Sequence, residues 1–285
     1  METAVTLQDR LTRVVVAPEL GGSLVSWTTL NDERALLRPA TLPATSPRQL
    51  GCYPLVPWSN RIASGGFDTP EGWMALPANT DGSPLAVHGS AWQQPWQVVA
   101  QSDQAVRLRL ESQLPFAYNA EQHIRLEEGC LSIELSVTHR DAQPAWHGLG
   151  LHPYFVRTPA TRVTAQASQV WLCDEQQLST QLSELPAEWD LRQGNGLPDE
   201  RVDNAFVGWD GVCRIEQEDA GYHLDCRAEG FGYYLLFCPP GQPFFCFEPV
   251  SHPVNAHHLP GRPGLVLLRE GEAHRARWSM QYTRL

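Results

Sequence analysis

Two short stretches of the sequence place a titratable residue in surroundings that are otherwise apolar. LGLHPYF, residues 149–155, holds His152 between an apolar pair and a proline that two aromatic residues follow. FFCFEPVSHPVNA, residues 244–256, holds Glu248 at the end of an almost continuously apolar run. A carboxylate in such a place is costly unless it is paired or used in chemistry. A carboxylate and an imidazole together can act as an acid–base pair.

Two further stretches carry side chains that could bind polar groups. PLVPWSNRIASGGF has Asn60 and Arg61 in a loop that ends in glycines, and AVHGSAW has His88 directly before a glycine. Each residue also has a purely structural explanation. The arginine could bridge two loops, the histidines could cap a turn or be satisfied in the core, and Glu248 could form a salt bridge with Arg61. The choice depends on whether these residues converge in the fold.

The composition argues against several classes of function. The 285 residues carry a formal net charge of −11, from 21 arginines and 32 acidic residues, with no basic run. Nucleic acid and anionic membranes are therefore poor partners, because both attract clustered cations. The absence of lysine excludes Schiff-base chemistry and a phosphate-loop lysine. The seven cysteines are scattered, which argues against a disulfide framework or a zinc knuckle.

The segment METAVTLQDR has neither the basic start nor the apolar core of a signal peptide. No apolar run reaches the length that a membrane span needs. The sequence thus favours a soluble cytoplasmic protein.

The elements that must position the candidate residues are predicted to be strands almost throughout. Short runs rich in Val, Leu, Ile and Thr, several of them with period-two alternation, are bounded by turn residues. These runs are TAVTLQ, LTRVVVAP, WQVVAQ, AVRLRLES and LSIELSVTH. Three hairpins are predicted: HIRLEEGCLSIELSV with its turn at 127–129, DGVCRIEQ with YHLDCRA, and YYLLFCPP with PFFCFEPV.

Helical signals are few. The segment 174–186, DEQQLSTQLSELP, favours one short helix, and AHHLP near the end favours a turn. Many short antiparallel strands with long loops indicate an all-β protein, a large antiparallel β-sandwich with few short helices. No composition shift marks a boundary, so residues 1–285 are expected to form a single domain.

The motifs NRIASGGF, HGSAW, LGLHPYF, VDNAF and FEPVSHPVNA resemble, in the same order, those of the aldose 1-epimerase (galactose mutarotase) family. The resemblance spans about residues 50–256, and HPYF and FEP are its most specific parts. It implies a twisted antiparallel supersandwich and an isomerase that interconverts the α and β anomers of aldohexoses. It implies no metal, nucleotide or redox cofactor. The partner is then a small sugar, bound by a monomer or a homodimer.

The resemblance also implies roles, carried over motif by motif. His152 is the expected general acid and Glu248 the expected general base. Sugar binding is expected from four residues, Asn60, Arg61, His88 and Asp203. We further expect a carboxylate, Glu248 or Asp203, to keep the imidazole charged against desolvation. Walls for the sugar could come from four aromatic residues for which core packing is an equal alternative: Tyr154, Phe155, Trp58 and Trp92.

Two other functions remain open. A non-catalytic carbohydrate-binding protein could keep Arg61, His88 and Asp203, although the presence of both acid and base favours an enzyme. A hexose-6-phosphate 1-epimerase would need further cations for the phosphate, which Arg157 and Arg262 could supply. A glycosidase is disfavoured, because it needs two carboxylates at the scissile bond and leaves the histidines without a role.

Overall fold

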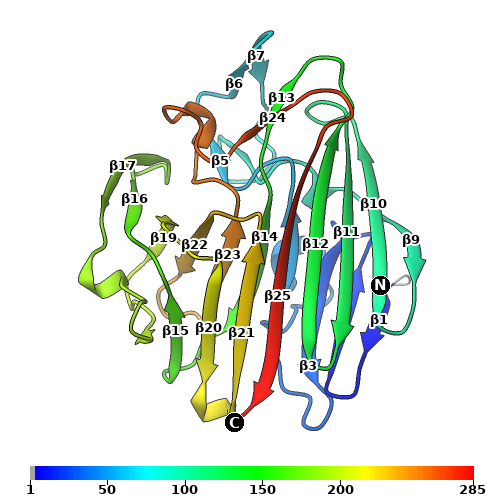
Figure 1. The fold of residues 1–285 in the computed structure, drawn as a ribbon, viewed down its shortest axis with the longest axis vertical. Coiled ribbons are helices and arrows are strands. Elements are labelled where there is room, and N and C mark those ends of the chain that lie inside the picture. Colours follow the sequence, from blue (N-terminus) through cyan, green and yellow to red (C-terminus); the bar gives the residue numbers. More distant parts are fainter. Residues whose placement is uncertain (1–3) are drawn as a thin grey trace.

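Strands joined by loops make up most of the structure, a computed structural model that describes residues 4–285 (Figure 1). Two large antiparallel sheets contain ten and nine strands. In the order of neighbours, the ten-stranded sheet contains β1 (Val5–Gln8), β2 (Thr12–Ala17), β3 (Ser23–Thr29), β4 (Cys52–Leu55), β14 (Gly150–Val156), β23 (Phe244–Val250), β22 (Tyr233–Cys238), β19 (Val202–Val207), β16 (Gln169–Cys173) and β17 (Ser179–Glu184).

The nine-stranded sheet lies opposite the first. In the same order it contains β18 (Asn195–Gly196), β15 (Thr161–Ala165), β20 (Val212–Gln217), β21 (Tyr222–Glu229), β25 (Ala273–Arg284), β12 (Cys130–His139), β11 (Tyr118–Glu127), β10 (Ala105–Ser112) and β9 (Gln97–Gln101). Three two-stranded sheets pair β13 (Ala145–His147) with β24 (Val266–Leu268), β5 (Arg61–Ile62) with β8 (Ala86–Val87), and β6 (Gly66–Thr69) with β7 (Gly72–Ala75). The predicted antiparallel sandwich is confirmed.

The predicted hairpins are present. Strands β11 and β12 pair up to Glu127 and Cys130, so Glu128 and Gly129 form a two-residue turn. Their φ angles of 50° and 75° are of the kind that a tight hairpin turn requires. Strands β20 and β21 form the second hairpin, and β22 and β23 the third. The run TAVTLQ corresponds to β1, with Thr3 outside the described residues.

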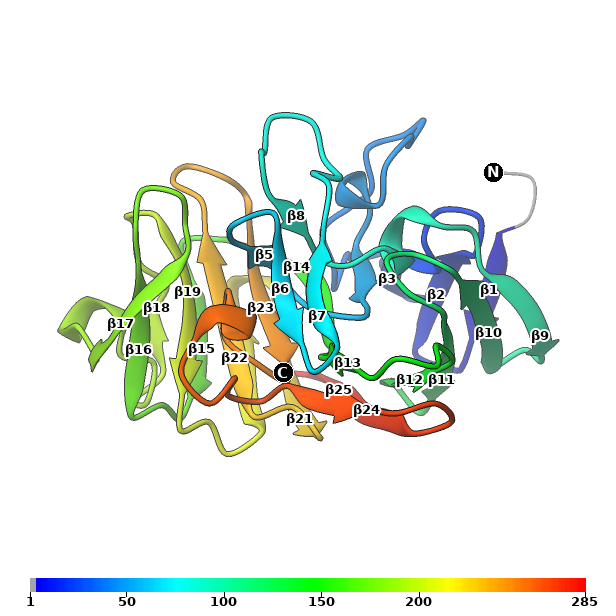
Figure 2. The same ribbon diagram turned by 90° about the horizontal axis from the view of Figure 1, so that it is seen from above.

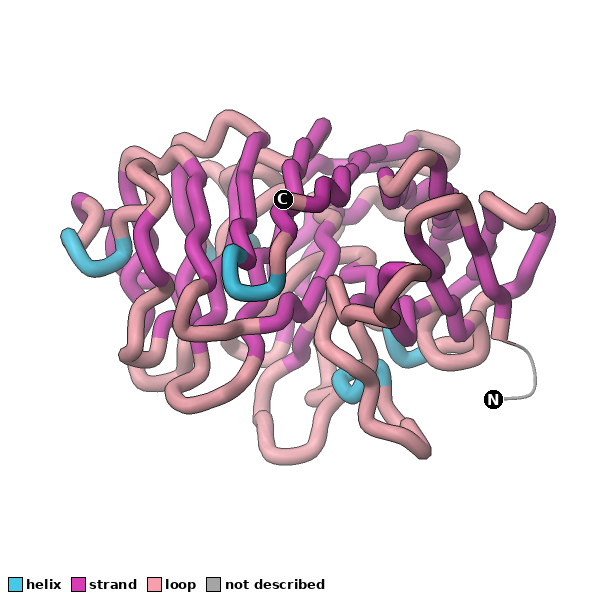
Figure 3. Tube along the Cα trace, turned by 90° about the horizontal axis from the view of Figure 1, so that it is seen from below, coloured by secondary structure: helices cyan, strands magenta, loops and turns pink. Residues whose placement is uncertain are grey.

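The helix predicted at 174–186 is wrong. Its residues Ser179–Glu184 form β17, which pairs with β16 at the edge of the ten-stranded sheet. Its side chains are largely exposed, so it lacks the alternation that distinguishes a strand from a polar surface helix. Helical structure in residues 4–285 consists of short 3₁₀ segments, including Ala256–His258 where a turn was predicted (Figure 3). None of the helices described there has the length and apolarity that a membrane crossing needs.

The main core fills the space between the two large sheets, which Figure 2 shows in edge view. Phe247 of β23, for example, stacks on Trp278 of β25, with 6.4 Å between the ring centroids. Because side chains alternate along a strand, Cys246 and Glu248 point to the opposite face of the ten-stranded sheet. That face carries a second, smaller apolar cluster, which includes Tyr53 and Cys246. Both faces of β23 are thus covered, which explains its continuous apolar sequence.

Candidate active site

All six predicted site residues line one cavity of about 360 Å³. They are Asn60, Arg61, His88, His152, Asp203 and Glu248. The cavity lies on the outer face of the ten-stranded sheet. Figure 2 shows the segment that contains β5 to β8 close to β14 and β23. Arg61 of β5, and His88 directly after β8, line the cavity. Its volume falls in the range of small-molecule sites, about 300–1,000 Å³.

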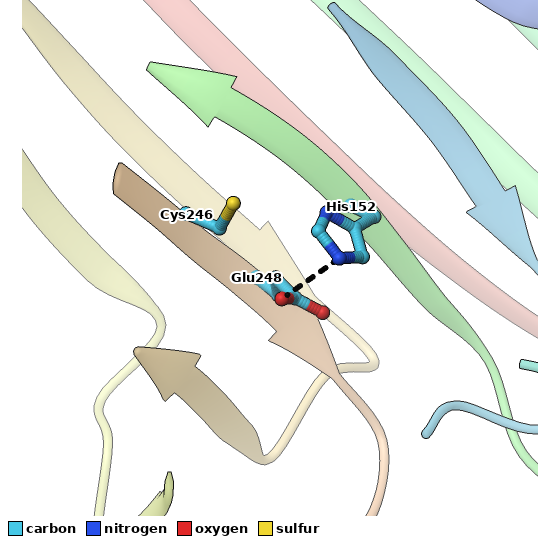
Figure 4. Close-up of side chains that lie close together, drawn as sticks. All are labelled: His152, Cys246 and Glu248. Atoms are coloured by element: carbon cyan, nitrogen blue, oxygen red, sulfur yellow. Dashed lines mark ion pairs between the residues drawn. The ribbon is translucent and has the colours of Figure 1, made fainter. Parts of the chain in front are cut away.

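Strand register brings His152 and Glu248 together (Figure 4). Strands β14 and β23 are antiparallel, and the register that pairs Tyr154 with Cys246 places His152 opposite Glu248. The Nε2 atom of His152 lies 3.3 Å from Oε1 of Glu248. On the other side, Tyr53 of β4 lies opposite His152 and stacks on its ring, with centroids 4.6 Å apart. Neighbours in the sheet therefore fix the imidazole on both sides.

Burial changes the proton affinity of both groups in opposite directions. His152 is 7% exposed and Glu248 is 1% exposed. Burial, assisted by the nearby Asp203 carboxylate, raises the pKa of Glu248 well above its usual value. Burial, with smaller contributions from Arg48 and Arg38, lowers the pKa of His152 to about 3. Both shifts favour the neutral pair, with one proton on Glu248, over the ion pair.

The directions of both pKa shifts run against the expectation that a carboxylate keeps the His152 imidazole charged. Desolvation of the ring and the positive charges of Arg48 and Arg38 disfavour the imidazolium. Glu248 also leaves one polar atom without a partner, since Oε2 accepts no hydrogen bond from residues 4–285. Such a buried atom costs about 1–3 kcal/mol. A polar ligand in the cavity can supply the missing hydrogen bond.

Asn60 and His88 hold each other through backbone and side-chain hydrogen bonds. The Asn60 N–H donates to Nδ1 of His88 over 3.0 Å, and the His88 N–H donates to the Asn60 carbonyl over 2.9 Å. Because Nδ1 accepts and burial lowers the pKa of His88 well below its usual value, the ring proton is on Nε2. Oδ1 of Asn60 accepts from both the backbone N–H and Nη1 of Arg61, each over 2.9 Å. This places the arginine at the cavity wall.

Asp203 of β19 is the carboxylate that Arg61 contacts. Its Oδ2 lies 3.5 Å from Nη2 of Arg61 and 3.5 Å from Nη2 of Arg201. The salt bridge considered between Glu248 and Arg61 is thus replaced by one to Asp203. Burial raises the pKa of Asp203, and the two arginines oppose that rise. The result is a buried acceptor that the guanidinium groups of two arginines contact.

The remaining aromatic residues and arginines that the sequence singled out lie in different places. Tyr154 lines the cavity, whereas Phe155 and Trp58 belong to the main core. Trp92 stacks beneath Tyr53, with centroids 5.4 Å apart. The two arginines considered for a phosphate are not in the cavity wall. Arg157 donates to the carbonyl of Pro198, and Arg262 lies over the ring of Trp146.

Several cavity residues have no counterpart in the sequence prediction. They are Arg48, Tyr53, Arg201, Phe237 and the loop 80–83. Arg201 was detectable, because it precedes Asp203 by two residues and so lies on the same side of the extended chain. Tyr53 and Phe237 depend on which strands are neighbours. No feature of the sequence around Arg48 marks it.

Comparison with known proteins gives consistent relatives. The family model for aldose 1-epimerase matches residues 3–281. The Escherichia coli K12 protein YphB, named as uncharacterized, is 34% identical over 260 residues, which cover 88% of this chain and 89% of YphB.

Solved structures agree with the architecture. An Escherichia coli K12 crystal structure, provisionally described as an aldose 1-epimerase, matches with a TM-score of 0.93 at 33% identity over 99% of both chains. The galactose 1-epimerase of Lactobacillus acidophilus NCFM matches with a TM-score of 0.82 at 16% identity, over 99% of this chain and 94% of that one. At that identity the likeness shows the fold alone.

Proposed function

The chain belongs to the aldose 1-epimerase family, and from this premise we propose that it is an aldose 1-epimerase of carbohydrate metabolism. It interconverts the α and β anomers of an aldohexose by opening and reclosing the ring. The observation that carries the proposal is the 3.3 Å contact between His152 and Glu248 in the wall of a sugar-sized cavity. A carboxyl and an imidazole so placed are the two proton carriers that ring opening needs.

The proposed reaction moves two protons and breaks one bond. Glu248 takes the proton of the anomeric hydroxyl while His152 gives a proton to the ring oxygen. The bond between the anomeric carbon and the ring oxygen breaks, its electron pair stays on the oxygen, and an aldehyde forms. After rotation about the C1–C2 bond, both transfers reverse and the ring closes on the other face. The pair holds one proton before and after each step.

The pKa shifts stabilise the charge state that the pair has when the sugar is an open chain. With the closed sugar the pair is Glu248 carboxylate and His152 imidazolium, and with the open aldehyde both groups are neutral. Burial raises the pKa of Glu248 and lowers that of His152, so it stabilises the neutral pair. Before the ring opens, the proton of the resting neutral pair has to move from Glu248 to His152, at a cost in free energy, and ring opening then restores the neutral pair.

The four other residues are proposed to hold the sugar. The Nε2–H of His88 and the guanidinium of Arg61 can donate to sugar oxygens, while Asp203 can accept from a hydroxyl. Asn60 acts through its hydrogen bonds to His88 and Arg61. The contact between acid and base supports an enzyme over a non-catalytic sugar-binding protein.

Hexose-6-phosphate epimerisation is a second candidate, and Arg48 is the observation that favours it. Arg48 lines the cavity, lies over the ring of Trp92 at 5.1 Å, and forms no ion pair with any carboxylate of residues 4–285. An arginine without a counter-ion can bind a phosphate in two-point contact. The two arginines predicted for this purpose lie elsewhere, so Arg48 takes their place in the hypothesis.

Polarimetry tests both candidates. We expect the protein to accelerate the approach to equilibrium of freshly dissolved α-D-glucose or α-D-galactose, and Glu248→Gln to abolish the acceleration. Acceleration confined to hexose 6-phosphates, and lost in Arg48→Gln, would select the second candidate. Measurable sugar binding without acceleration of either class would select the non-catalytic alternative.

A further inference from the structure

Cys246 has no part in the proposed reaction, yet its side chain lies beside both proton carriers (Figure 4). It precedes Glu248 by two residues on β23, so both side chains share one face of the strand. The Sγ atom, a ring nitrogen of His152 and a carboxylate oxygen of Glu248 all lie within 4.8 Å of one another. All three side chains are buried. Among residues 4–285, no other three side chains of His, Cys, Asp or Glu converge in this way.

Sulfur, nitrogen and oxygen donors together match the preferences of Zn²⁺ and related thiophilic cations. A thiolate and a carboxylate would also neutralise the charge of a divalent ion, which removes much of the cost of burying it. Three protein ligands leave the fourth position of a tetrahedral ion free. Because His152 and Glu248 line the cavity, that position faces the space that the sugar would occupy.

The distances fit a tetrahedral ion after a small adjustment. Bonds of about 2.0–2.3 Å at tetrahedral angles place the ligand atoms about 3.3–3.6 Å apart. The His152–Glu248 contact of 3.3 Å already meets this condition. The Sγ atom of Cys246 lies within 4.8 Å of the other two donor atoms, and rotation of its side chain about the Cα–Cβ bond is the movement that would bring it closer. The unpartnered Oε2 of Glu248 leaves the carboxylate free to turn towards the ion.

We propose that His152, Cys246 and Glu248 form a binding site for a thiophilic divalent cation such as Zn²⁺, which excludes sugar from the cavity. Binding releases the proton of the Cys246 thiol and the proton that His152 and Glu248 share, so it strengthens as the pH rises. The ion is an inhibitor of the site and has no role in the proton transfers.

Titration of the whole protein with Co²⁺ tests the metal site without any activity measurement. We expect one equivalent to bind and to produce the near-ultraviolet thiolate-to-cobalt charge-transfer band, which Zn²⁺ then displaces. Cys246→Ser should lose the band. Cys238→Ser is the matched control, since Cys238 is a buried thiol of the adjacent β22 whose side chain belongs to the main core. It should keep the band.

Two results would overturn the proposal: no charge-transfer band in the folded wild-type protein, or an equal band in Cys246→Ser. If Cys246→Ser does not fold, anomalous diffraction from a zinc-soaked wild-type crystal gives the same decision. A peak between the three side chains supports the site, and a peak only elsewhere refutes it. Inhibition of mutarotation by Zn²⁺, reversed by a chelator, is a further arm that rests on the proposed function. Because cobalt binding is measured without any activity, its result tests the metal site whether or not the protein proves to be an epimerase.

Discussion

Glu248 lies directly opposite His152 across the antiparallel pair β23 and β14, and 3.3 Å separates Oε1 of the first from Nε2 of the second. Backbone register sets this relationship, so no loop has to close to bring the two proposed proton carriers together. Sites built on paired strands hold their geometry more closely than sites on loops. Tyr53, opposite His152 on β4, adds a stacked ring that restricts the imidazole further.

Replacing His152 with alanine should reduce turnover much more than sugar affinity. Loss of a general acid typically costs about 10²–10⁴-fold in rate. We expect the dissociation constant for the sugar to change less than tenfold, which corresponds to a loss of binding free energy below about 1.4 kcal/mol. Polarimetry gives the rate and calorimetry the affinity. His123→Ala, on β11 of the other large sheet, is the control. Equal losses in rate and affinity would argue against the acid role.

The pH–rate profile should lack an inflection at the usual pKa of histidine, about 6.5. The active pair holds one proton, and a second proton binds only near the lowered pKa of His152, about 3. The raised pKa of Glu248 moves loss of the shared proton towards higher pH. We therefore expect kcat/KM to be flat from about pH 5 to 7, after subtraction of the spontaneous rate. An acid limb centred near 6.5 would contradict the assignment.

Strand alternation was sufficient to predict the sandwich, and the motifs that resemble the aldose 1-epimerase family pointed to the six residues that line the cavity. Alternation along FFCFEPV separates Phe247, which faces the core, from Glu248, which faces the cavity. The edge strand β17 was misassigned because its exposed side chains carry no alternation. Tyr53 was missed because β4 and β14 are neighbours in the sheet although about a hundred residues separate them in the chain. Such long-range pairing leaves no local pattern.

The charge state of His152 was also beyond the sequence. A histidine and a glutamate in apolar stretches suggest an ion pair, but desolvation decides whether the two side chains are charged or neutral. The fold buries both groups almost completely, and Arg48, which no motif marks, adds a positive charge to the same cavity wall. Burial acting on both partners favours the neutral pair.

The free energy of unfolding should fall as the pH is lowered from about 6.5 towards 4. Five buried histidines have a lowered pKa: His88, His147, His152, His252 and His257. In this pH window the unfolded chain binds more protons than the folded one, so each histidine contributes a loss of up to about 1.4 kcal/mol per pH unit. Glu248 and Asp203, whose pKa is raised, make the free energy of unfolding rise as the pH falls, but they are two groups against five histidines.

Urea unfolding at pH 7.5, 6 and 5 measures this dependence. His252 provides the matched variant, because its pKa is lowered to about 4 and it lies outside the cavity. Its Nε2 accepts from the Ser59 N–H, and its Nδ1 donates to the Pro253 carbonyl. His252→Gln should be less stable at pH 7.5 and should show a shallower pH slope. Equal stability of the wild-type protein at pH 7.5 and 5 would show that the histidines are not held neutral.

Gly89→Ala should destabilise the protein and weaken sugar binding together. Gly89 has a φ of 64°, and an added Cβ would lie 2.2 Å from the Val56 carbonyl oxygen. The left-handed conformation alone costs alanine roughly 1–2 kcal/mol, and the clash with backbone must displace the neighbouring His88. Gly271→Ala isolates the first cost, because Gly271 has a φ of 82° and open space around it. Urea unfolding should give a larger loss of unfolding free energy for Gly89→Ala than for Gly271→Ala, and only Gly89→Ala should bind sugar more weakly. Equal losses in the two variants would mean that the approach of Gly89 to Val56 does not position His88.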